Sequence, residues 1–470
     1  MGRCAGDDGC RSMSEVTVIG GGLAGITAAL DCADGGRRVT LLEVRRRLGG
    51  AAYSFEREGL QMDNGQHVFL RCCDAYRALL ERLGSSHLVE VQERLSIPVL
   101  RPGRPPALIR RSSLPAPLHL AGALAGYPYL SARRRLGAAW AAVGLMRLDI
   151  GDPGLDRVTF GEWLARHGQD REAVEALWDL IALPTLNLPA ADASLALAAF
   201  VFRRGLLSGA DAGDIGFHVG TLQSIIGDPA RTALERAGVD VRLGWRAESL
   251  AREGDGFELR GRGGEGEELL QAGSVIVALP HNRAGALLEP LLGRHAGMAG
   301  ELESSPIVNL HVLYGSRVLD QPFAAGVGTP VQYLFDRTEA GGAPPGCQYL
   351  AVSLSGASRE MEMSVDQLRE RYLPALAELI PRARDAHVEK FLVTREHAAT
   401  FRAAPGTAAL RPGARTSVAG LALAGNWTGT GWPATLESAV LSGHAAARVT
   451  LSELSARRAA GEAEPMRGPR

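Results

Sequence analysis

Five consecutive residues, Asp63-Asn64-Gly65-Gln66-His67, place one carboxylate, two carboxamides and an imidazole in a single short segment. An imidazole with its ordinary pKa of about 6.5 suits proton transfer at neutral pH, and a nearby carboxylate can orient it or stabilise positive charge. His67 and Asp63 are therefore candidate catalytic residues. The alternative is that these side chains only satisfy backbone groups in a buried loop, since buried polar groups need hydrogen-bond partners.

A glycine-rich segment upstream predicts a dinucleotide-binding site. It fits G-x-G-x-x-G, follows an apolar strand at 16–19, opens a helix at 23–34 and precedes a second strand at 38–43. The glycines permit a tight turn, a close approach to a pyrophosphate and close helix packing, while the helix N-terminus attracts phosphates. An acid ending the second strand would bind ribose hydroxyls. The predicted contacts are Gly20, Gly22, Leu23, Ala24, Gly25 and Glu43.

Two further glycine-rich segments favour FAD over NAD, because an extended flavin dinucleotide needs contacts along its whole length. One is Gly49-Gly50, just beyond the first site, and the other is the C-terminal stretch "LAGNWTGTGWP". A helix starting after Pro433 would offer free N–H groups to negative charge on a reduced flavin. The additional predicted contacts are Arg45, Gly49, Gly50, Ala51, Ala247, Gly425, Asn426, Trp432, Thr435 and Leu436.

The arrangement resembles the superfamily of amine oxidases, phytoene desaturases and GDP-dissociation inhibitors over roughly residues 15–450. Within it, "DNGQHV", "REHAATFRAAPG" and "GNWTGTGWPATLESAVLSG" look most like hydroxysqualene dehydroxylases, also called squalene-associated FAD-dependent desaturases. The resemblance implies replacement of the allylic hydroxyl of hydroxysqualene by hydrogen from reduced FAD, which gives squalene for hopanoid biosynthesis. In that reaction His67 would help the hydroxyl depart as water, and Asp63 would orient His67 or stabilise the allylic cation.

Three positions depart from the pattern common in the superfamily. Ala51 stands where arginine is common, Asn426 where aspartate is common, and Val44 where alanine is common. Asparagine can still hydrogen-bond ribityl and phosphate groups, because its carboxamide both donates and accepts. Ala51 and Asn426 bear on the affinity for FAD, whereas Val44 is a minor departure.

Other functions on the same fold remain open. A phytoene-type desaturase would use the flavin in the opposite redox direction on another long polyene. Several amine oxidases place a lysine beside the flavin on a substrate-domain strand, but the matching stretch "PIVNLHVLYG" has none and Lys390 is the only lysine of the chain. A non-catalytic lipid carrier is disfavoured by the intact glycine segments and Glu43.

These motifs must be positioned by an α/β fold. The sequence predicts a Rossmann-like FAD-binding domain, of the GR2 or amine-oxidase type, interleaved with an α+β substrate domain that contains a mixed sheet and apolar helices. The predicted FAD-binding domain comprises 14–90, 215–300 and 415–452, the substrate domain 91–214 and 301–414, and tails occupy 1–13 and 453–470.

Composition limits the partners. A net charge of −1 over 470 residues provides no field for nucleic acid. The six cysteines lack zinc-like spacing, which predicts reduced cytoplasmic thiols and no metal site.

A long isoprenoid substrate implies delivery from a membrane, so peripheral association with the cytoplasmic face is expected. The apolar segment after Pro117, with Arg133 to Arg135, and the apolar stretch Ala190 to Phe202 are expected to be helical. They would supply buried core helices, the wall of a lipid tunnel, or a face resting on anionic lipid. The electron donor is not identified, because no second nucleotide fingerprint is evident.

Overall fold

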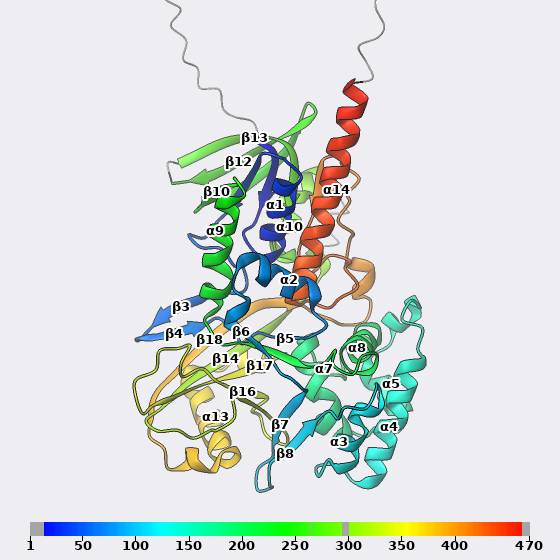
Figure 1. The fold of residues 1–470 in the computed structure, drawn as a ribbon, viewed down its shortest axis with the longest axis vertical. Coiled ribbons are helices and arrows are strands. Elements are labelled where there is room, and N and C mark those ends of the chain that lie inside the picture. Colours follow the sequence, from blue (N-terminus) through cyan, green and yellow to red (C-terminus); the bar gives the residue numbers. More distant parts are fainter. Residues whose placement is uncertain (1–13, 265, 294–299, 463–470) are drawn as a thin grey trace, which may run out of the picture.

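Two seven-stranded sheets organise the chain, and Figure 1 shows one above the other. The computed structural model describes residues 14–264, 266–293 and 300–462. The strand order is β10-β2-β1-β13-β12-β11 in the upper sheet, where β19 also pairs with β13, and β18-β14-β17-β16-β15-β7-β8 in the lower sheet. The molecule is therefore an α/β protein in which a Rossmann-like unit is interleaved with an α+β unit.

The centre of the upper sheet is parallel. β1 (Ser14–Ile19) lies between β2 (Val39–Glu43) and β13 (Gly266–Val277), while β10 (Asp240–Leu243) pairs with β2 and β19 (Leu421–Leu423) pairs with β13. Parallel strands covered on both faces are apolar along their length, which the buried residues of β1 and β2 illustrate. The carboxyl ends of these strands meet at one edge of the sheet.

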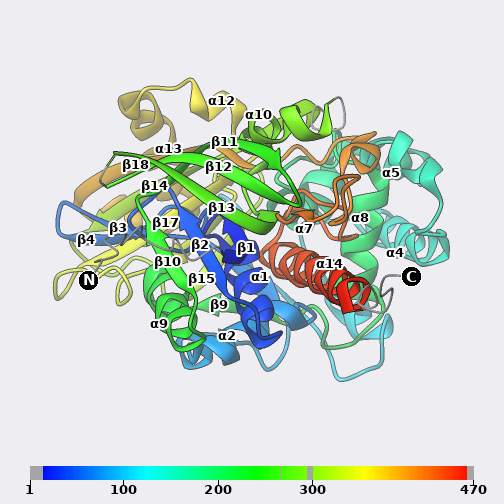
Figure 2. The ribbon, with the colours of Figure 1, turned by 90° about the horizontal axis from the view of Figure 1, so that it is seen from above.

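Two helices from opposite ends of the sequence pack side by side on this sheet, namely α1 (Leu23–Asp34) and α14 (Leu436–Glu462) (Figure 2). A Cβ atom at Gly443 would lie 2.4 Å from the carbonyl oxygen of Ala24, so the helices meet backbone to backbone. The remaining elements of this unit are β11 (Arg246–Glu253), β12 (Gly256–Gly263), α2 (Asp74–Leu83), α9 (Asp228–Arg236) and α10 (His281–Leu292).

Two small sheets lie between the large ones. The hairpin β3 (Ser54–Arg57) and β4 (Leu60–Asp63) leads through residues 64–67 into a three-stranded sheet. That sheet consists of β5 (Val68–Leu70), β9 (Ile215–His218) and β6 (Val89–Val91). The polar segment singled out from the sequence therefore crosses the junction of the two units.

The lower sheet is centred on β14 (Ser304–Tyr314), which pairs antiparallel with β17 (Gln348–Ser355) and β18 (Val388–Phe401). Its other strands are β16 (Tyr333–Asp336), β15 (Phe323–Gly326), β7 (Ser96–Leu100) and β8 (Ala107–Arg110). The helices of this unit are α3 (Ala121–Gly126), α4 (Ala132–Arg147), α5 (Phe160–Arg166), α6 (Arg171–Ala173), α7 (Asp179–Leu186), α8 (Leu195–Phe202), α12 (Ser358–Met361) and α13 (Val365–Leu379).

Short 3-10 and π-helical turns connect these elements. Three π turns, η4 (Val174–Trp178), η5 (Arg203–Leu207) and η6 (Gln223–Gly227), adjoin α7, α8 and α9. The 3-10 turns are η1 (Ser86–Leu88), η2 (Leu118–Leu120), η3 (Pro153–Arg157), η7 (Pro381–Arg384) and η8 (Thr407–Leu410).

Every strand of the upper sheet comes from 14–90, 215–300 or 415–452, and every strand of the lower sheet from 91–214 or 301–414. The structure differs from expectation at the C-terminal end, because residues 453–462 continue α14 instead of forming a tail. The alanine-rich sequence there is compatible with a helix. The predicted tail at 1–13 and residues 463–470 lie outside the described residues.

The apolar segments expected to be helical behave in two ways. α8 is almost wholly buried, and Phe202 at its end joins an aromatic cluster with Phe160 and Trp178. The segment 121–150 instead forms two helices, α3 and α4, and α4 buries only one face. In the described residues, no helix combines the length and apolar character needed to cross a bilayer.

Candidate functional site

The first glycine turn connects β1 to α1 and has no room for a side chain at Gly20 or Gly25. Gly20 has φ +115°, and a Cβ atom there would lie 2.5 Å from the carbonyl oxygen of Ala278. A Cβ atom at Gly25 would lie 1.8 Å from the carbonyl oxygen of Gly20. The start of α1 therefore lies directly against the ends of β1 and β13, as the sequence pattern predicts.

The second glycine pair lies against the first turn. Gly49 donates its N–H to the Gly21 carbonyl at 2.9 Å, and a Cβ atom at Gly50 would lie 2.7 Å from Cα of Gly22. No described side chain caps α1 at Gly22, so the first N–H groups of Leu23 and Ala24 have no partner within the helix. Bare backbone beside an uncapped helix start fits the pyrophosphate of a dinucleotide.

Glu43 is buried at the end of β2, and its carboxylate supports the turn. It accepts hydrogen bonds from the N–H groups of Gly21 at 2.7 Å and Arg45 at 2.8 Å. The N–H of Trp245 donates to the Glu43 carbonyl, which brings β11 and Ala247 to the same end of the site. Each carboxylate oxygen retains capacity for a ribose hydroxyl. Glu43 thus has a structural role in addition to the predicted one.

The third glycine segment lies at the same sheet edge as the first. Ile19 of β1 and Leu423 of β19 both pair in parallel with Val277 of β13, so the turns that follow β1 and β19 are one strand apart. Gly425 follows β19 with φ +139°. An extended ligand can therefore contact both turns, as expected for FAD.

Side chains of this third segment shape the start of α14. Thr435 accepts a hydrogen bond from the N–H of Ser438 at 3.2 Å, as an N-cap residue does for the helix that begins at Leu436. Asn426 is half-buried next to Gly425, and its carbonyl accepts from the hydroxyl of Ser438. Trp432 meets Phe200 of α8 edge-on at 5.1 Å between ring centroids. The predicted contacts of this segment therefore share one loop.

Arg411 was not anticipated from the sequence. Its guanidinium donates to the carbonyls of Trp427, Thr428 and Trp432, so one cation holds the whole loop. Burial lowers the pKa of Arg411 to about 10. No motif around residue 411 predicts this role. The acceptors are backbone carbonyls, which any residue type provides, so the sequence holds no signal for them.

The candidate catalytic carboxylate is engaged within the protein. Asp63 is buried and accepts hydrogen bonds from the hydroxyl of Ser54 at 2.6 Å, the N–H of Leu222 at 3.0 Å and the guanidinium of Arg337 at 2.8 Å. It makes no hydrogen bond to His67 among the described contacts, contrary to the expectation that it orients the imidazole. A catalytic role for Asp63 stays a prediction.

His67 is oriented by its own backbone. Its Nδ1 lies 3.0 Å from the carbonyl oxygen of Gly65, and because a carbonyl only accepts, the proton must be on Nδ1. Nε2 is then the free acceptor. Burial lowers the pKa of His67, and the Gly65 carbonyl and the charges of Asp63 and Glu396 oppose this shift only in part. The resting imidazole is therefore neutral at neutral pH.

A second histidine, His218, binds the backbone of the loop formed by residues 64–67. His218 of β9 donates from Nδ1 to the His67 carbonyl at 2.8 Å, so its Nε2 accepts from the hydroxyl of Tyr76 at 2.7 Å. Burial lowers the pKa of His218 to about 3, which keeps it neutral. Arg337 donates to the carbonyls of His218 and Gly220 as well as to Asp63. His218 and Arg337 were missed, since they lie 151 positions from His67 and 274 positions from Asp63.

Asn64 connects the loop to the second glycine segment and to the lower sheet. Its carboxamide oxygen accepts a hydrogen bond from the N–H of Tyr53. Its carboxamide nitrogen donates to the carbonyl of Ala51 and to the carboxylate of Glu396 on β18. Its backbone carbonyl accepts from the side chains of Asn309 on β14 and Thr394 on β18, at 3.0 and 3.3 Å. Ala51, predicted as a cofactor contact, is thereby held beside the polar loop.

Two buried polar atoms beside this loop have no partner among the described residues. They are Oδ1 of Asn309, whose side chain is wholly buried, and Nε2 of Gln66. A buried carboxamide normally satisfies both its donor and its acceptor. One free acceptor and one free donor near residues 64–67 fit a ligand that offers both, as the edge of an isoalloxazine ring does.

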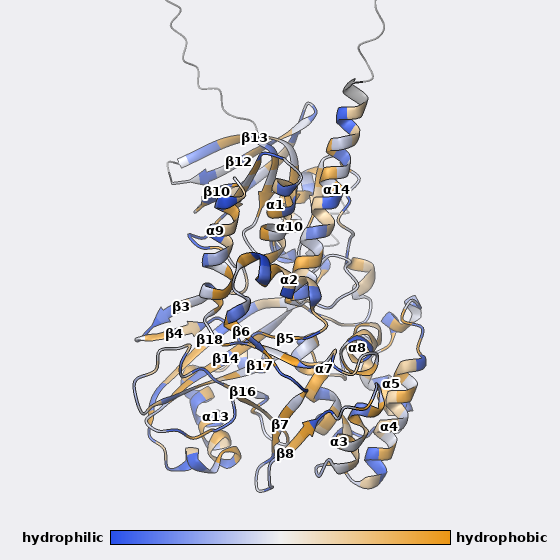
Figure 3. Cartoon of the chain, in the orientation of Figure 1, coloured by the Kyte–Doolittle hydropathy of each residue, from blue (hydrophilic) through white to orange (hydrophobic). Residues whose placement is uncertain are grey.

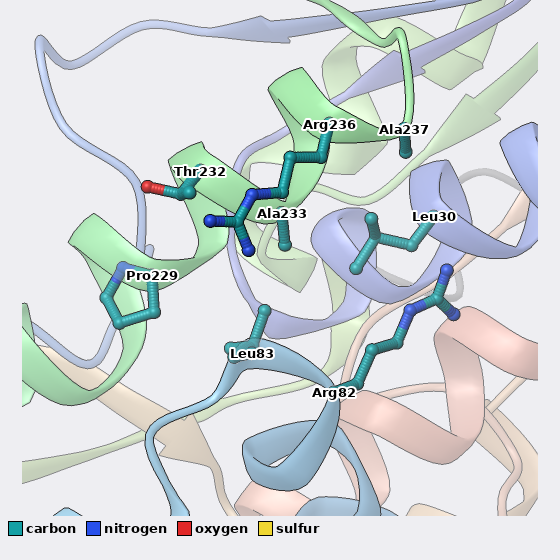
Figure 4. Close-up of a pocket in the computed structure, with 8 residues that line it drawn as sticks. All are labelled: Leu30, Arg82, Leu83, Pro229, Thr232, Ala233, Arg236 and Ala237. Carbon is teal, nitrogen blue, oxygen red and sulfur yellow. The ribbon is translucent and has the colours of Figure 1, made fainter.

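A surface depression of about 250 Å³ lies elsewhere, among α1, α2 and α9 (Figure 4). Arg82 at its rim already pairs with Asp31 and Asp34, at 3.2 and 2.7 Å. The depression is separate from the glycine segments and from the polar loop. It contributes nothing to the candidate site.

Comparison with known proteins places these features in a family. The pattern of flavin-containing amine oxidoreductases matches residues 23–451. The hydroxysqualene dehydroxylase of Zymomonas mobilis subsp. mobilis is 26% identical, covering 94% of this chain and 100% of that enzyme. The zeta-carotene desaturase of Arabidopsis thaliana is 24% identical, covering 92% of this chain and 84% of that enzyme.

Among solved structures, the cyclohexylamine oxidase of Brevibacterium oxydans superposes with a TM-score of 0.71 at 19% identity. The superposition covers 94% of this chain and 100% of that one. At this identity the likeness concerns the fold, and it agrees with a Rossmann-like unit interleaved with a mixed sheet.

Proposed function

The chain belongs to the flavin-containing amine oxidoreductase family and is an FAD-dependent oxidoreductase, and on this basis we propose that it is a hydroxysqualene dehydroxylase. The reaction would replace the allylic hydroxyl of hydroxysqualene by hydrogen and give squalene. The observation that carries the proposal is the end-to-end similarity to the Zymomonas enzyme, over 94% of this chain and 100% of the relative. The site contributes supporting chemistry.

The residues that would hold FAD follow from the three glycine segments. The turn at Gly20 to Gly25 and the pair Gly49-Gly50 would receive the pyrophosphate, Glu43 the ribose, and the start of α14 the flavin ring. Bound in its reduced form, FAD would supply the hydride that forms the new C–H bond while the C–O bond breaks and the hydroxyl leaves as water. The chain must supply the remaining proton, and an external donor must restore the electrons.

His67 is the proposed source of that proton. Its Nδ1 proton is held by the Gly65 carbonyl, so only Nε2 is free to carry a second proton to the leaving hydroxyl. Because burial lowers the pKa of His67, its protonated form is scarce at neutral pH but is a stronger acid than an exposed imidazolium. Asp63 is proposed to position the loop, since Arg337 already balances its charge.

The apolar helices next to the third glycine segment suit a hydrocarbon substrate. Phe200 of α8 meets Trp432, and the hydroxyl of Tyr333 donates to the carbonyl of Leu180 in α7, which brings both helices against the cofactor loop and the lower sheet. α8 reads "LALAAFVF" without a charged residue. Such walls exclude water from a reaction in which water would compete for the allylic cation.

A carotene-type desaturase is the second candidate, because the Arabidopsis zeta-carotene desaturase also matches over 92% of this chain. An amine oxidase is disfavoured by the position of the single lysine. Lys390 on β18 donates to the carbonyl of Glu58, in the exposed turn between β3 and β4. The lysine therefore lies away from the loop at residues 64–67.

The test uses the purified flavoprotein, photoreduced without oxygen. Hydroxysqualene should reoxidise the flavin and give one squalene per flavin, whereas squalene added as a control should leave the absorbance unchanged. In a parallel tube, oxidised protein receives phytoene or zeta-carotene. Bleaching there, with no squalene in the first tube, would assign the protein to the desaturases, and a protein that binds no flavin would refute the enzyme assignment.

A further inference from the structure

One corner of the lower unit exposes hydrophobic side chains that the described residues leave uncovered. Ten large hydrophobic residues are exposed among the described residues, and six of them fall between 108 and 150. Scattered exposed hydrophobic residues are ordinary, whereas a group on adjoining elements marks an interaction surface. The six are Leu108, Leu114, Leu118, Leu136, Trp140 and Ile150.

Helix α4 carries the centre of this surface. Leu136 is 74% exposed and Trp140 is 63% exposed, and their spacing of four residues places them on one side of the helix. Arg133 and Arg147 lie on the same side, one turn before and two turns after this pair, and both are exposed. The opposite side packs into the core through residues that are at most 1% exposed, namely Ala138, Ala141 and Leu145.

The elements next to α4 extend the surface. α3 contacts α4, η2 and β8, so Leu118 on η2 and Leu108 on β8 belong to the same corner, at the lower right of Figure 1. Leu118 is 56% exposed and Leu108 is 50% exposed. In Figure 3, β7 and β8 are strongly hydrophobic and hydrophilic stretches of α4 lie close by. We call the surface formed by β8, η2, α3 and α4 the α4 face.

The charge of this segment is strongly positive although the whole chain is almost neutral. Residues 101–150 contain eight arginines and one aspartate, a formal charge of +7, in a chain whose net charge is −1. Two of the arginines are neutralised within the molecule, Arg111 by Asp214 and Arg134 by Asp170 and Glu172. The exposed ones include Arg104, Arg110, Arg133 and Arg147.

We propose that the α4 face rests on a lipid bilayer that contains anionic lipids. Leucine and tryptophan side chains would enter the interfacial layer while the arginines around them meet the phosphate headgroups. The combination favours a membrane over a protein partner, because the exposed tryptophan and leucines project singly and the unneutralised exposed arginines lie on or beside the same elements. The use of this contact, delivery of an isoprenoid, rests on the proposed function, but the contact itself does not.

The test is flotation of the flavin-loaded protein with vesicles in a density gradient. The protein should float with vesicles of phosphatidylcholine and phosphatidylglycerol, less with phosphatidylcholine alone, and less as salt is added. The double variant Leu136→Ser/Trp140→Ser should reduce flotation by about tenfold or more. Arg133→Gln/Arg147→Gln should reduce binding to anionic vesicles and weaken its dependence on salt.

The matched control is Val365→Ser, since Val365 is exposed to 43% on α13, outside the α4 face. It should float like the parent protein, and all variants must keep their flavin. The proposal is overturned if the parent protein does not float, or if the Leu136/Trp140 variant floats unchanged. It is also overturned if that variant converts a dimer to a monomer in light scattering, because a second copy would then cover the face. None of these results depends on squalene formation, which is measured separately in detergent.

Discussion

The glycine cradle and the polar loop lie close together in the site but are built on different principles. The cradle, formed by the turn at Gly20 to Gly25 and by Gly49-Gly50, has no room for a side chain at Gly20, Gly25, Gly49 or Gly50, because a Cβ atom at each would lie 1.8 to 2.7 Å from another backbone atom. The loop at residues 64–67 is held almost entirely by side chains, from β9, β14, β18 and the segment after β16. Close backbone packing maintains the conformation of the cradle, whereas buried hydrogen bonds and an ion pair maintain the conformation of the loop. The two regions should therefore fail in different ways.

The largest effect is expected from breaking the cradle. Gly25→Ala would put a methyl group 1.8 Å from the Gly20 carbonyl oxygen, so we expect the free energy of unfolding to fall by more than roughly 4 kcal/mol and flavin to be lost. Urea unfolding and the flavin-to-protein absorbance ratio measure both. Gly122→Ala is the control, because nothing lies within 4 Å of a Cβ atom there.

A low pH should reduce the stability of the loop region, because buried histidines there must become protonated. The pKa of His218 is lowered to about 3 by burial, and so is the pKa of His311 on β14, whose Nε2 lies 3.1 Å from the hydroxyl of Thr394. The ordinary pKa in an unfolded chain is about 6.5. The unfolded state then binds more protons, so stability is full above pH of about 6.5 and falls as the pH drops toward 3, by roughly 4 kcal/mol per histidine. His218→Gln should flatten this dependence, and His87→Gln, at an exposed position, should not.

The ion pair under the loop gives the next effect. Arg337→Met leaves the buried carboxylate of Asp63 without its cation, which should cost about 3 kcal/mol. Adding Asp63→Asn should recover part of that loss, and chemical denaturation of the two variants provides the comparison. Flavin content should stay close to that of the parent protein, because the cradle is intact. Equal destabilisation of the single and double variants would contradict the idea that the unpaired carboxylate causes the loss.

His67 should change the reaction while leaving stability almost unchanged. His67→Gln is expected to lower the single-turnover rate of squalene formation by about 100-fold, with a change in unfolding free energy below about 0.5 kcal/mol. The parent rate should rise as pH falls toward the lowered pKa of His67, and the variant should lack this rise. A pH profile that is the same in both proteins would leave His67 only a hydrogen-bonding role.

The smallest effect is expected at the single lysine. Lys390→Met removes a hydrogen bond to the exposed turn at Glu58, far from both regions. The rate and the flavin content should be unchanged, and stability should change by less than about 0.5 kcal/mol. A large loss of rate would contradict this prediction and would favour an amine oxidase.

The same contrast explains what could be predicted from the sequence. The glycines of the cradle lie within about 30 positions of each other, so spacing alone located α1 at 23–34 and placed Glu43 at the end of the next strand. The loop was recognised by composition, but its supports were not. Arg337 is 274 positions from Asp63, and His218 is 151 positions from His67, so no local pattern links them.

Helix α4 shows a third kind of limit. In "ARRRLGAAWAAVGLMR" the many alanines give no clear apolar stripe, so the sequence favoured buried core helices and left a lipid-facing helix as the alternative. Only the packing of Ala138, Ala141 and Leu145 into the core decided which side faces outward.

The contact between α1 and α14 has a consequence for when the fold is completed in a cell. The parallel strand β19 and the helix α14 arise from the last part of the described chain, yet they complete the sheet edge and the helix layer begun by the first strand and helix. During synthesis the amino-terminal βαβ unit emerges hundreds of residues before these partners. The sheet edge and the helix layer that carry the glycine segments are therefore complete only once the segment beyond residue 420 has been translated.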